Sequence, residues 1–325
     1  MISSEEFAGL TYEEQVANLQ RLGEKALHDF GVQALEIKTL VHFENTTFYV
    51  NSPEGEFNLR ISRPGTQTLE TIESEVHFLS ALRSDGFRVP SPYQNRIVTN
   101  SDKEVPDERH SVLFHWMHGD LIRDQLTTSV SRLVGQSLAK LHEFVSTWER
   151  PATFYRAQLH QWLFNKRKPT RIDQPVDGLS EDDRYMLLQI EEEARVLVPT
   201  LPQTSDRFGL IHADLHGGNL LIEDGQLNMI DFDDCGFGYF YYDFGAALGF
   251  QLSDPYFQEL KEAMLNGYEE VRPLPPQTRE LIDFFIKLRM TGVSRWIMDR
   301  VDNPRLKEAG PEWVRRFCEG MRTLD

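Results

Sequence analysis

The hydrophobic and polar positions of the chain follow two different periods, one before and one after residue 116. Before it, short segments alternate, as in residues 56–62, where Phe57, Leu59 and Ile61 are separated by polar side chains. This alternation predicts half-buried strands. After residue 116, apolar positions recur with the period of an α-helix, which predicts amphipathic helices. The pattern therefore predicts a sheet-rich part followed by a mainly helical part.

The first part is predicted to fold as an antiparallel sheet of roughly five strands with one main helix. Turn signals such as Ser-Pro-Glu-Gly at residues 52–55 separate the strands, and Gly31 ends a helix that precedes them. Because Arg60 alternates with apolar neighbours, we expect it on the polar face of its strand, placed to reach into a cleft. The predicted strands are residues 34–43, 48–51, 56–62, 96–99 and 111–116, and the predicted helices are residues 11–30 and 68–84.

The second part is predicted to consist of helices around one short hairpin. The hairpin strands are residues 220–222 and 227–230, joined by the polar turn of residues 223–226. We therefore expect an α+β protein with two lobes, residues 1–116 and residues 117–325. The predicted helices of the second lobe are residues 129–148, 182–198, 255–271, 277–298 and 307–321.

Composition narrows the range of partners. The chain has 325 residues, enough for two cores, and its 40% hydrophobic and 26% charged residues are ordinary for a globular protein. The net charge of −17 argues against nucleic acid or an anionic membrane as a partner, because both select a basic surface. Two cysteines, no signal peptide and no apolar run near about 18 residues predict a cytoplasmic protein.

The candidate chemistry lies in residues 210–238, LIHADLHGGNLLIEDGQLNMIDFDDCGFG. His212, Asp214 and Asn219 match the H-x-D-L-x-x-x-N catalytic loop of protein kinases, with Ala213 at the position of its arginine. Downstream, residues 231–233 read Asp-Phe-Asp where a protein kinase has Asp-Phe-Gly. The spacing therefore predicts a phosphoryl-transfer site.

The residue types fit that chemistry. Phosphoryl transfer needs a carboxylate near the attacking hydroxyl, oxygen ligands for Mg²⁺ and a cation on the phosphates. Asp214 is the candidate base, and Asn219 and Asp231 are the candidate metal ligands, which the predicted hairpin brings together at its open end. Two interpretations of Asp233 stay open, a second metal ligand or a residue that stabilises the loop. His216 is expected to contact either the loop backbone or Asp231.

Two other interpretations remain at this stage. His212, Asp214 and His216 alternate in the manner of a metal-ligand cluster, which would suit a metallohydrolase, but that hypothesis leaves Asn219 and the hairpin without a role. The basic and aromatic segment of residues 148–182 is either a loop and short helix packed over the second lobe or a site for an anionic ligand.

The segments HADLHGGN and IDFDD together resemble the signature of the aminoglycoside phosphotransferase and choline kinase superfamily, which includes type II homoserine kinases, stress-response kinases and methylthioribose kinases. The resemblance extends over nearly the whole chain up to about residue 250. It implies a two-lobed protein-kinase-like fold, with a nucleotide-binding first lobe and a catalytic second lobe. It also implies ATP and Mg²⁺ as cofactors.

The resemblance assigns a role to each matching position. Asp214 is implied as the base, Asn219 and Asp231 as Mg²⁺ ligands, and His212 and His216 as residues that shape the loop. The remaining assignments are a phosphate-covering turn at Glu44, Asn45, Thr46 and Thr47, Arg60 in place of the phosphate-binding lysine with Glu75 as its partner, the adenine hinge at Phe114, His115 and Trp116, and Asp243 as a brace of the catalytic loop.

The function predicted from these residues is transfer of the γ-phosphoryl group of ATP to a hydroxyl group of a small molecule. An amino alcohol, a sugar or an aminoglycoside-like compound is the expected acceptor, with Tyr239, Tyr241 and Trp296 as candidate walls of its site. A protein Ser/Thr kinase would use the same residues. A nucleotide-binding pseudokinase is the alternative without catalysis.

Overall fold

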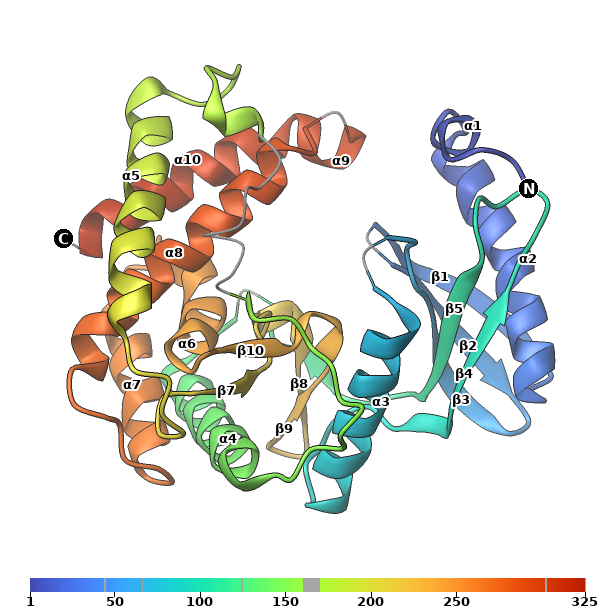
Figure 1. Ribbon diagram of the computed structural model, residues 1–325, viewed down its shortest axis with the longest axis horizontal. Coiled ribbons are helices and arrows are strands. Elements are labelled where there is room, and N and C mark those ends of the chain that lie inside the picture. The colour runs from blue at the N-terminus through green and yellow to red at the C-terminus, as the bar shows by residue number, and fades with distance from the viewer. Residues whose placement is uncertain (44, 66, 124, 160–169, 302, 325) are drawn as a thin grey trace. The chain divides into compact units, whose positions relative to one another are not determined.

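The computed structural model describes residues 1–325 except residues 44, 66, 124, 160–169, 302 and 325, and its chain forms two compact units (Figure 1). Unit 1 consists of Met1–His118, Arg150–Tyr155 and Asn228–Asp233. Unit 2 consists of Gly119–Glu149, Arg156–Leu227 and Asp234–Asp325. The chain therefore returns to unit 1 twice after first leaving it.

Unit 1 contains the predicted five-stranded antiparallel sheet, drawn in blue and teal in Figure 1. The strand order is β1-β2-β3-β5-β4, and every neighbouring pair is antiparallel. The strands are β1 (Glu36–His42), β2 (Thr46–Ser52), β3 (Gly55–Ile61), β4 (Pro92–Asn100) and β5 (Arg109–His115). Strands β1, β2 and β3 are consecutive in the chain and adjacent in the sheet, so they form a meander.

Three helices accompany this sheet: α1 (Ser4–Ala8), α2 (Tyr12–Phe30) and α3 (Leu69–Ser84). Helix α2 begins with a capping box between Thr11 and Glu14 and ends at Gly31, whose φ of 76° is left-handed. Its Leu22 is fully buried in one core with Phe48 of β2. Helix and sheet thus share a single apolar core in unit 1.

Strand β3 differs from its predicted two-faced pattern. The apolar face of Phe57 and Leu59 is buried, but Arg60 and Ser62 on the opposite face are buried as well, with only 4% and 2% of their surface exposed. Arg60, expected to reach into a cleft, is buried against the side chain of Glu75 on α3, the partner that the resemblance implied. The polar face of β3 therefore carries a buried ion pair.

Unit 2 is mainly helical. The helix predicted at residues 307–321 is present as α10, and a further short helix, α9, precedes it and ends at Lys307. Short helix α6 lies in the aromatic run that follows Phe240. The helices are α4 (Thr128–Thr147), α5 (Glu181–Leu197), α6 (Tyr241–Leu248), α7 (Phe257–Glu269), α8 (Thr278–Met298), α9 (Pro304–Lys307) and α10 (Ala309–Met321).

Two small sheets carry the loops that contain the candidate residues. Strand β7 (Phe208–Ile211) pairs antiparallel with β10 (Gly236–Tyr239). Strands β6 (Asp120–Leu121), β8 (Leu220–Glu223) and β9 (Gln226–Met229) form the other sheet in the order β6-β8-β9. The predicted hairpin is thus present as β8 and β9.

The segment of residues 148–182 is described except for residues 160–169. In unit 2, Arg156 is buried and its Nε donates to the carbonyl oxygen of Cys235 at 2.5 Å, while Gln158 bridges to Phe237 of β10. The described part of this segment within unit 2 therefore packs along β10, as the loop interpretation expects.

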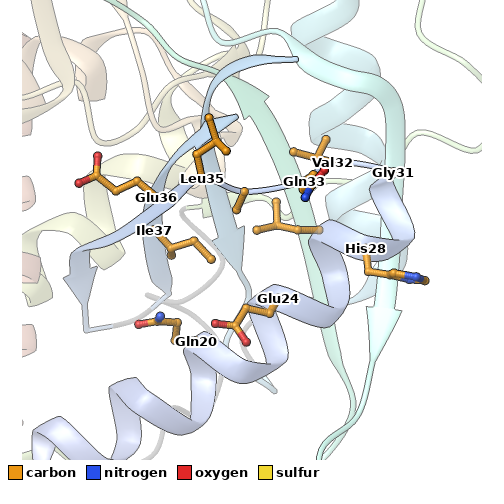
Figure 2. Close-up of a pocket in the computed structure, with 11 residues that line it drawn as sticks. Gln20, Glu24, His28, Gly31, Val32, Gln33, Leu35, Glu36 and Ile37 are labelled. Atoms are coloured by element: carbon orange, nitrogen blue, oxygen red, sulfur yellow. The ribbon is translucent and has the colours of Figure 1, made fainter. Parts of the chain in front are cut away.

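A cavity of about 660 Å³ lies in unit 1 where the end of α2 meets the start of β1 (Figure 2). Gln20, Glu24 and His28 line it from α2, and Leu35 and Ile37 from the β1 side. None of the predicted site residues lines this cavity.

Among the described residues, no helix combines the length and apolar character that crossing a bilayer requires.

Candidate active site

The loop that follows β7 is held by Asp243, in the first turn of α6. Asp243 is fully buried, and its two carboxylate oxygens accept hydrogen bonds from the backbone N–H groups of His212 at 3.1 Å and Ala213 at 2.7 Å. Ala213 needs such support because its φ of 71° is unfavourable for a residue with a Cβ atom. The brace that the resemblance implied therefore lies at the position expected of it.

Asp243 is itself oriented by His142 on α4, a residue that the sequence analysis did not identify. Nε2 of His142 lies 3.2 Å from the Asp243 carboxylate, and Nδ1 lies 3.0 Å from the hydroxyl of Tyr268. Since a carboxylate only accepts, Nε2 carries the proton and Nδ1 accepts from Tyr268. Burial lowers the pKa of His142, although Asp243 raises it in part, so the ring is neutral.

Asp214 is surrounded by three side-chain donors of unit 2. Nδ2 of Asn219 lies 3.2 Å from Oδ2 and 2.9 Å from the backbone oxygen of Asp214, and Nε2 of His216 lies 3.6 Å from Oδ2. The guanidinium of Arg289 donates to Oδ1. Burial alone would raise the pKa of Asp214, but Arg289 and His216 together hold it well below its ordinary range.

The two histidines of the motif shape the loop, as the resemblance implied. Nδ1 of His212 accepts from the backbone N–H of Asp214 at 3.3 Å, and His212 is fully buried. Nδ1 of His216 accepts from the backbone N–H of Gly218 at 3.0 Å. Of the two contacts expected for His216, the one with the loop backbone is therefore present.

Arg60 and Glu75 form a buried bidentate ion pair in unit 1. Nη1 and Nη2 of Arg60 donate to the two carboxylate oxygens of Glu75 at 2.8 and 2.5 Å. Burial alone would lower the pKa of Arg60, but Glu75 and Asp233 raise it above its ordinary value. The guanidinium also lies over the ring of Phe114, 5.1 Å from its centroid. Unit 1 therefore holds a permanent, firmly oriented cation.

Asp233 is tied to the loops of unit 1. Its Oδ1 lies 3.7 Å from Nη1 of Arg60, and its Oδ2 accepts from Nδ2 of Asn45 at 2.8 Å. Its backbone oxygen accepts from Nε2 of Gln67 at 2.9 Å. These contacts favour the loop-stabilising interpretation of Asp233 within unit 1.

The predicted phosphate-covering turn is shorter than the sequence suggested. Thr46 and Thr47 belong to β2, where Thr46 is buried and its hydroxyl lies 2.8 Å from Nδ1 of His42. Asn45 precedes the strand, and Glu44 lies outside the described residues. Both threonines were placed in the turn by sequence alone, because a polar Asn-Thr-Thr run gives no signal of where pairing begins.

The predicted hinge continues the sheet. Phe114 is buried in β5, and the backbone N–H of Trp116 donates to the carbonyl oxygen of Glu56 at 2.9 Å. The ring of Trp116 packs edge-on against Tyr49 at 5.0 Å. The N–H of Trp116 is therefore satisfied within unit 1.

The candidate metal ligands have the oxygen chemistry that Mg²⁺ selects. Asp231 follows β9, is exposed, and has a φ of 62°. Nδ2 of Asn219 faces Asp214, which leaves its carbonyl oxygen as the atom available to a metal. Within the described part of the chain, no group of three or more His, Cys, Asp or Glu residues is arranged to hold a metal. A carboxylate and an amide oxygen fit Mg²⁺, which retains several water or phosphate ligands.

The predicted aromatic walls are mostly core residues. Tyr239 and Tyr241 are buried with Phe285 in one apolar cluster, so they do not line an acceptor site. Trp296 is partly exposed, with the guanidinium of Arg300 4.7 Å from its ring centroid. Phe250 was not predicted as a wall but lies beside the motif, with its ring 5.3 Å from that of His216. Its position in the segment LGFQL carried no sequence signal.

Comparison with known proteins gives a consistent assignment. Residues 36–281 match the sequence model of a family described as the phosphotransferase enzyme family. Amicoumacin kinase of Bacillus subtilis (strain 168) is 22% identical over 293 residues, covering 86% of this chain and 82% of that protein. Homoserine kinase of Polaromonas naphthalenivorans (strain CJ2) is 27% identical over 273 residues, covering 79% and 78%.

Solved structures agree in fold. The microcompartment-associated aminopropanol kinase superposes with a TM-score of 0.81 and 29% identity, covering 94% of this chain and 97% of that one. An amicoumacin kinase in complex with AMP-PNP, Ca²⁺ and Ami superposes with a TM-score of 0.77 and 18% identity, covering 96% of each chain. The predicted α+β, protein-kinase-like fold class is confirmed.

Proposed function

The chain belongs to the phosphotransferase enzyme family, and we propose that it transfers the γ-phosphoryl group of ATP to a hydroxyl group of a small molecule. The resemblance to the aminoglycoside phosphotransferase and choline kinase superfamily is confirmed by the same match. The enzyme class predicted from the sequence, a kinase, is confirmed with it. The nucleotide, the metal and the acceptor belong to the proposal.

One observation carries the proposal, namely the conformation of the loop after β7. Asp214 is ionised, and the loop that carries it is fixed by hydrogen bonds to the carboxylate of Asp243. The side-chain amide of Asn219 donates to the Asp214 carboxylate. An ionised carboxylate held by the amide nitrogen of Asn219, with the amide oxygen left for a metal, supports phosphoryl transfer on the acceptor side. Asp214 is proposed to orient the acceptor hydroxyl and to accept its proton as the bond to phosphorus forms.

The donor side is proposed to use the cation of unit 1. Glu75 holds the Arg60 guanidinium in one orientation, and that guanidinium would contact the phosphates of ATP. Arginine keeps the charge of the usual lysine, and because Nη1 and Nη2 each donate one hydrogen to Glu75, the remaining N–H groups of the guanidinium would contact the phosphate oxygens. Asn45 would contribute to covering the phosphates, and Phe114 lies under the guanidinium.

Asn219 and Asp231 are proposed to hold Mg²⁺, with Asp233 retained as a candidate for a second ion. When bound, Mg²⁺ would offset the negative charge that accumulates on the phosphate oxygens. The chain's own contribution is the fixed loop conformation: Asn219 is anchored by its amide to Asp214, and Asp231 takes a left-handed backbone. We propose the cytoplasm, where ATP is supplied, as the site of action.

The proposed acceptor is a small hydroxyl compound that carries an amino group. Relatives named for aminopropanol, homoserine and amicoumacin support this class. The test uses three pairs of compounds that differ only by a carboxylate: threonine and isopropanolamine, homoserine and propanolamine, serine and ethanolamine. Each is incubated with ATP and Mg²⁺, and phosphorylated product is measured by mass spectrometry.

Turnover of any of the six compounds supports the proposal, and preference within a pair shows whether the carboxylate is recognised. The Asp214→Asn variant is the control, because it keeps the size of the side chain and loses the charge. Phosphate appearing only on added protein substrates would favour the protein kinase alternative. ATP binding without any transfer would favour the pseudokinase.

A further inference from the structure

Arg289 is a charged residue outside every motif of the chain, yet it contacts the proposed base. It lies on α8, 75 positions along the sequence from Asp214, and its Nη2 donates to Oδ1 of Asp214. Protein kinases carry an arginine directly before this aspartate, where the present chain has Ala213. In this fold a guanidinium therefore reaches the aspartate from a helix of the same unit.

The close approach of α6 and α8 places Arg289 at the loop. A Cβ atom on Gly245 of α6 would lie 2.7 Å from the backbone oxygen of Phe285 and 3.3 Å from Cβ of Arg289. Only glycine permits that contact. Helix α6 also carries Asp243, which holds the loop, so the same helix sets the position of the loop and of α8.

The guanidinium is fixed on its own side as well. It lies over the ring of Tyr242 on α6, 5.9 Å from the centroid, and only 17% of the Arg289 side chain is exposed. A planar guanidinium held in this way restricts the rotation of the carboxylate that it contacts. Asp214 then has one oxygen committed to Arg289, whereas Oδ2 is shared by Asn219 and His216.

We propose that Arg289 is a positioning residue that fixes the carboxylate of Asp214 so that Oδ2 meets the acceptor hydroxyl. This inference rests on the proposed function of Asp214. Arg289 acts through the carboxylate and not on the phosphates, so its loss should lower kcat and leave the KM for ATP unchanged. A small displacement of a reacting group costs about a hundredfold in rate, which is the expected loss of kcat in Arg289→Gln.

The experiment compares Arg289→Gln, Arg289→Lys and Arg289→Ala with a matched variant on the same helix. Arg279→Gln removes an exposed arginine of α8 whose partners are Glu262 at 2.7 Å and Glu269 at 3.0 Å on α7. Initial rates are measured with the best acceptor of the six compounds and, in parallel, as hydrolysis of ATP by water. Melting temperatures are recorded for each variant.

Three results are expected. Arg279→Gln keeps the wild-type kcat. Arg289→Lys retains more activity than Arg289→Gln, because lysine keeps the charge although it cannot reproduce the fork. Addition of methylguanidine raises the kcat of Arg289→Ala by about tenfold or more, because a guanidinium placed beside Asp214 recovers part of the lost orientation.

Each contrary outcome overturns the inference. A kcat for Arg289→Gln within twofold of wild type would exclude positioning. Loss of kcat without rescue by methylguanidine or lysine, together with a lowered melting temperature, would assign Arg289 a structural role only. If the wild type transfers phosphate neither to an acceptor nor to water, the proposed function is wrong, and the inference about Arg289 is wrong with it. If the wild type turns over and the Arg289 substitutions leave kcat unchanged, only the inference about Arg289 is rejected.

Discussion

Asp243 fixes the conformation of the loop that carries the proposed base. Its carboxylate accepts from two consecutive backbone N–H groups, those of His212 and Ala213, and from His142. These three donors are buried, so each would be left without a partner if the carboxylate were lost. Of these contacts, the one between the Ala213 N–H and Asp243 stabilises the left-handed backbone of Ala213 directly.

We expect Asp243→Asn to lower the free energy of unfolding by about 2 to 3 kcal/mol, since one amide oxygen cannot accept from all three donors. Urea denaturation measures the change. Asp206→Asn is the control, because Asp206 pairs with Arg207 at the surface of the same unit at 3.0 Å and should contribute less than about 1 kcal/mol. Equal stability of the two variants would contradict the bracing role.

His142 should make stability depend on pH. Burial depresses the pKa of His142 below its ordinary value, against the partial effect of Asp243 and with a further lowering by Arg272. A depressed pKa contributes stability that is fully present above the unfolded value of about 6.5 and is lost as pH falls toward the folded value. Melting temperatures between pH 8 and pH 5 should therefore fall more steeply in wild type than in His142→Gln. His28→Gln, at an exposed position, should follow wild type.

Of two ion pairs between single residues, one was predictable from the sequence and the other was not. Arg60 and Glu75 were predicted as partners because both stand at recognisable motif positions. Arg289 and Asp214 were not, because pairing between a loop and a helix distant in the chain leaves no periodic signal. His142 was missed for the same reason, since an apolar helix face with one histidine looks like any core-facing helix.

At the scale of elements, the packing of α4 and α7 depends on two glycines. A Cβ atom on Gly135 of α4 would overlap the backbone oxygen of Met264, and one on Gly267 of α7 would overlap the backbone oxygen of Arg132. The two helices therefore approach backbone to backbone, which a larger residue prevents. This contact also positions α4, which carries His142.

We expect Gly135→Ala to destabilise the protein by about 3 kcal/mol, because the helices must separate or bend to admit the methyl group. Gly292→Ala is the matched control on α8, where a Cβ atom would meet no other atom within 4 Å. That variant should be neutral or more stable by up to about 1 kcal/mol, since alanine favours the helix. Calorimetry distinguishes the two, and destabilisation of equal size in both would contradict the packing argument.

The sequence predicted elements with clear end signals and missed those without them. Helix α2 has a capping box and a terminal glycine, so its ends were predicted within one residue. Helix α6 was missed because Tyr241–Leu248 is apolar on nearly every side, and a helix buried all round shows no period. Strand β6 was missed because two residues are too few to establish alternation, and β10 was missed because Gly236 and Gly238 are typical of turns.

At the scale of the whole molecule, chain order and compact units do not coincide. Unit 1 includes Arg150–Tyr155 and Asn228–Asp233, both far in sequence from its main segment. A segment belongs to a compact unit because it contacts that unit in space. A single boundary along the sequence therefore cannot describe a unit that contains distant segments. The boundary predicted at residues 116 and 117 remains a prediction about function, with nucleotide binding assigned to the first part.

Nucleotide binding should be visible as a gain in stability of the whole chain. A ligand that binds only the folded state stabilises it by about 2.7 kcal/mol at a concentration one hundred times its Kd. We therefore expect AMP-PNP with Mg²⁺ to raise the melting temperature of the wild type, and chelation of the metal to remove most of the gain. Asp231→Asn should lose the same metal-dependent part, because an amide is a weaker ligand for Mg²⁺ than a carboxylate.

Asp224→Asn provides the control for this measurement. Asp224 is exposed, lies in the turn between β8 and β9, and shares with Asp231 a left-handed backbone, with φ values of 51° and 62°. Asparagine tolerates that backbone at both positions, so neither substitution should disturb the fold. The metal-dependent gain should persist in Asp224→Asn and disappear in Asp231→Asn. If both variants keep it, Asp231 is not a metal ligand, and the oxygen atoms that hold Mg²⁺ must come from elsewhere in the chain.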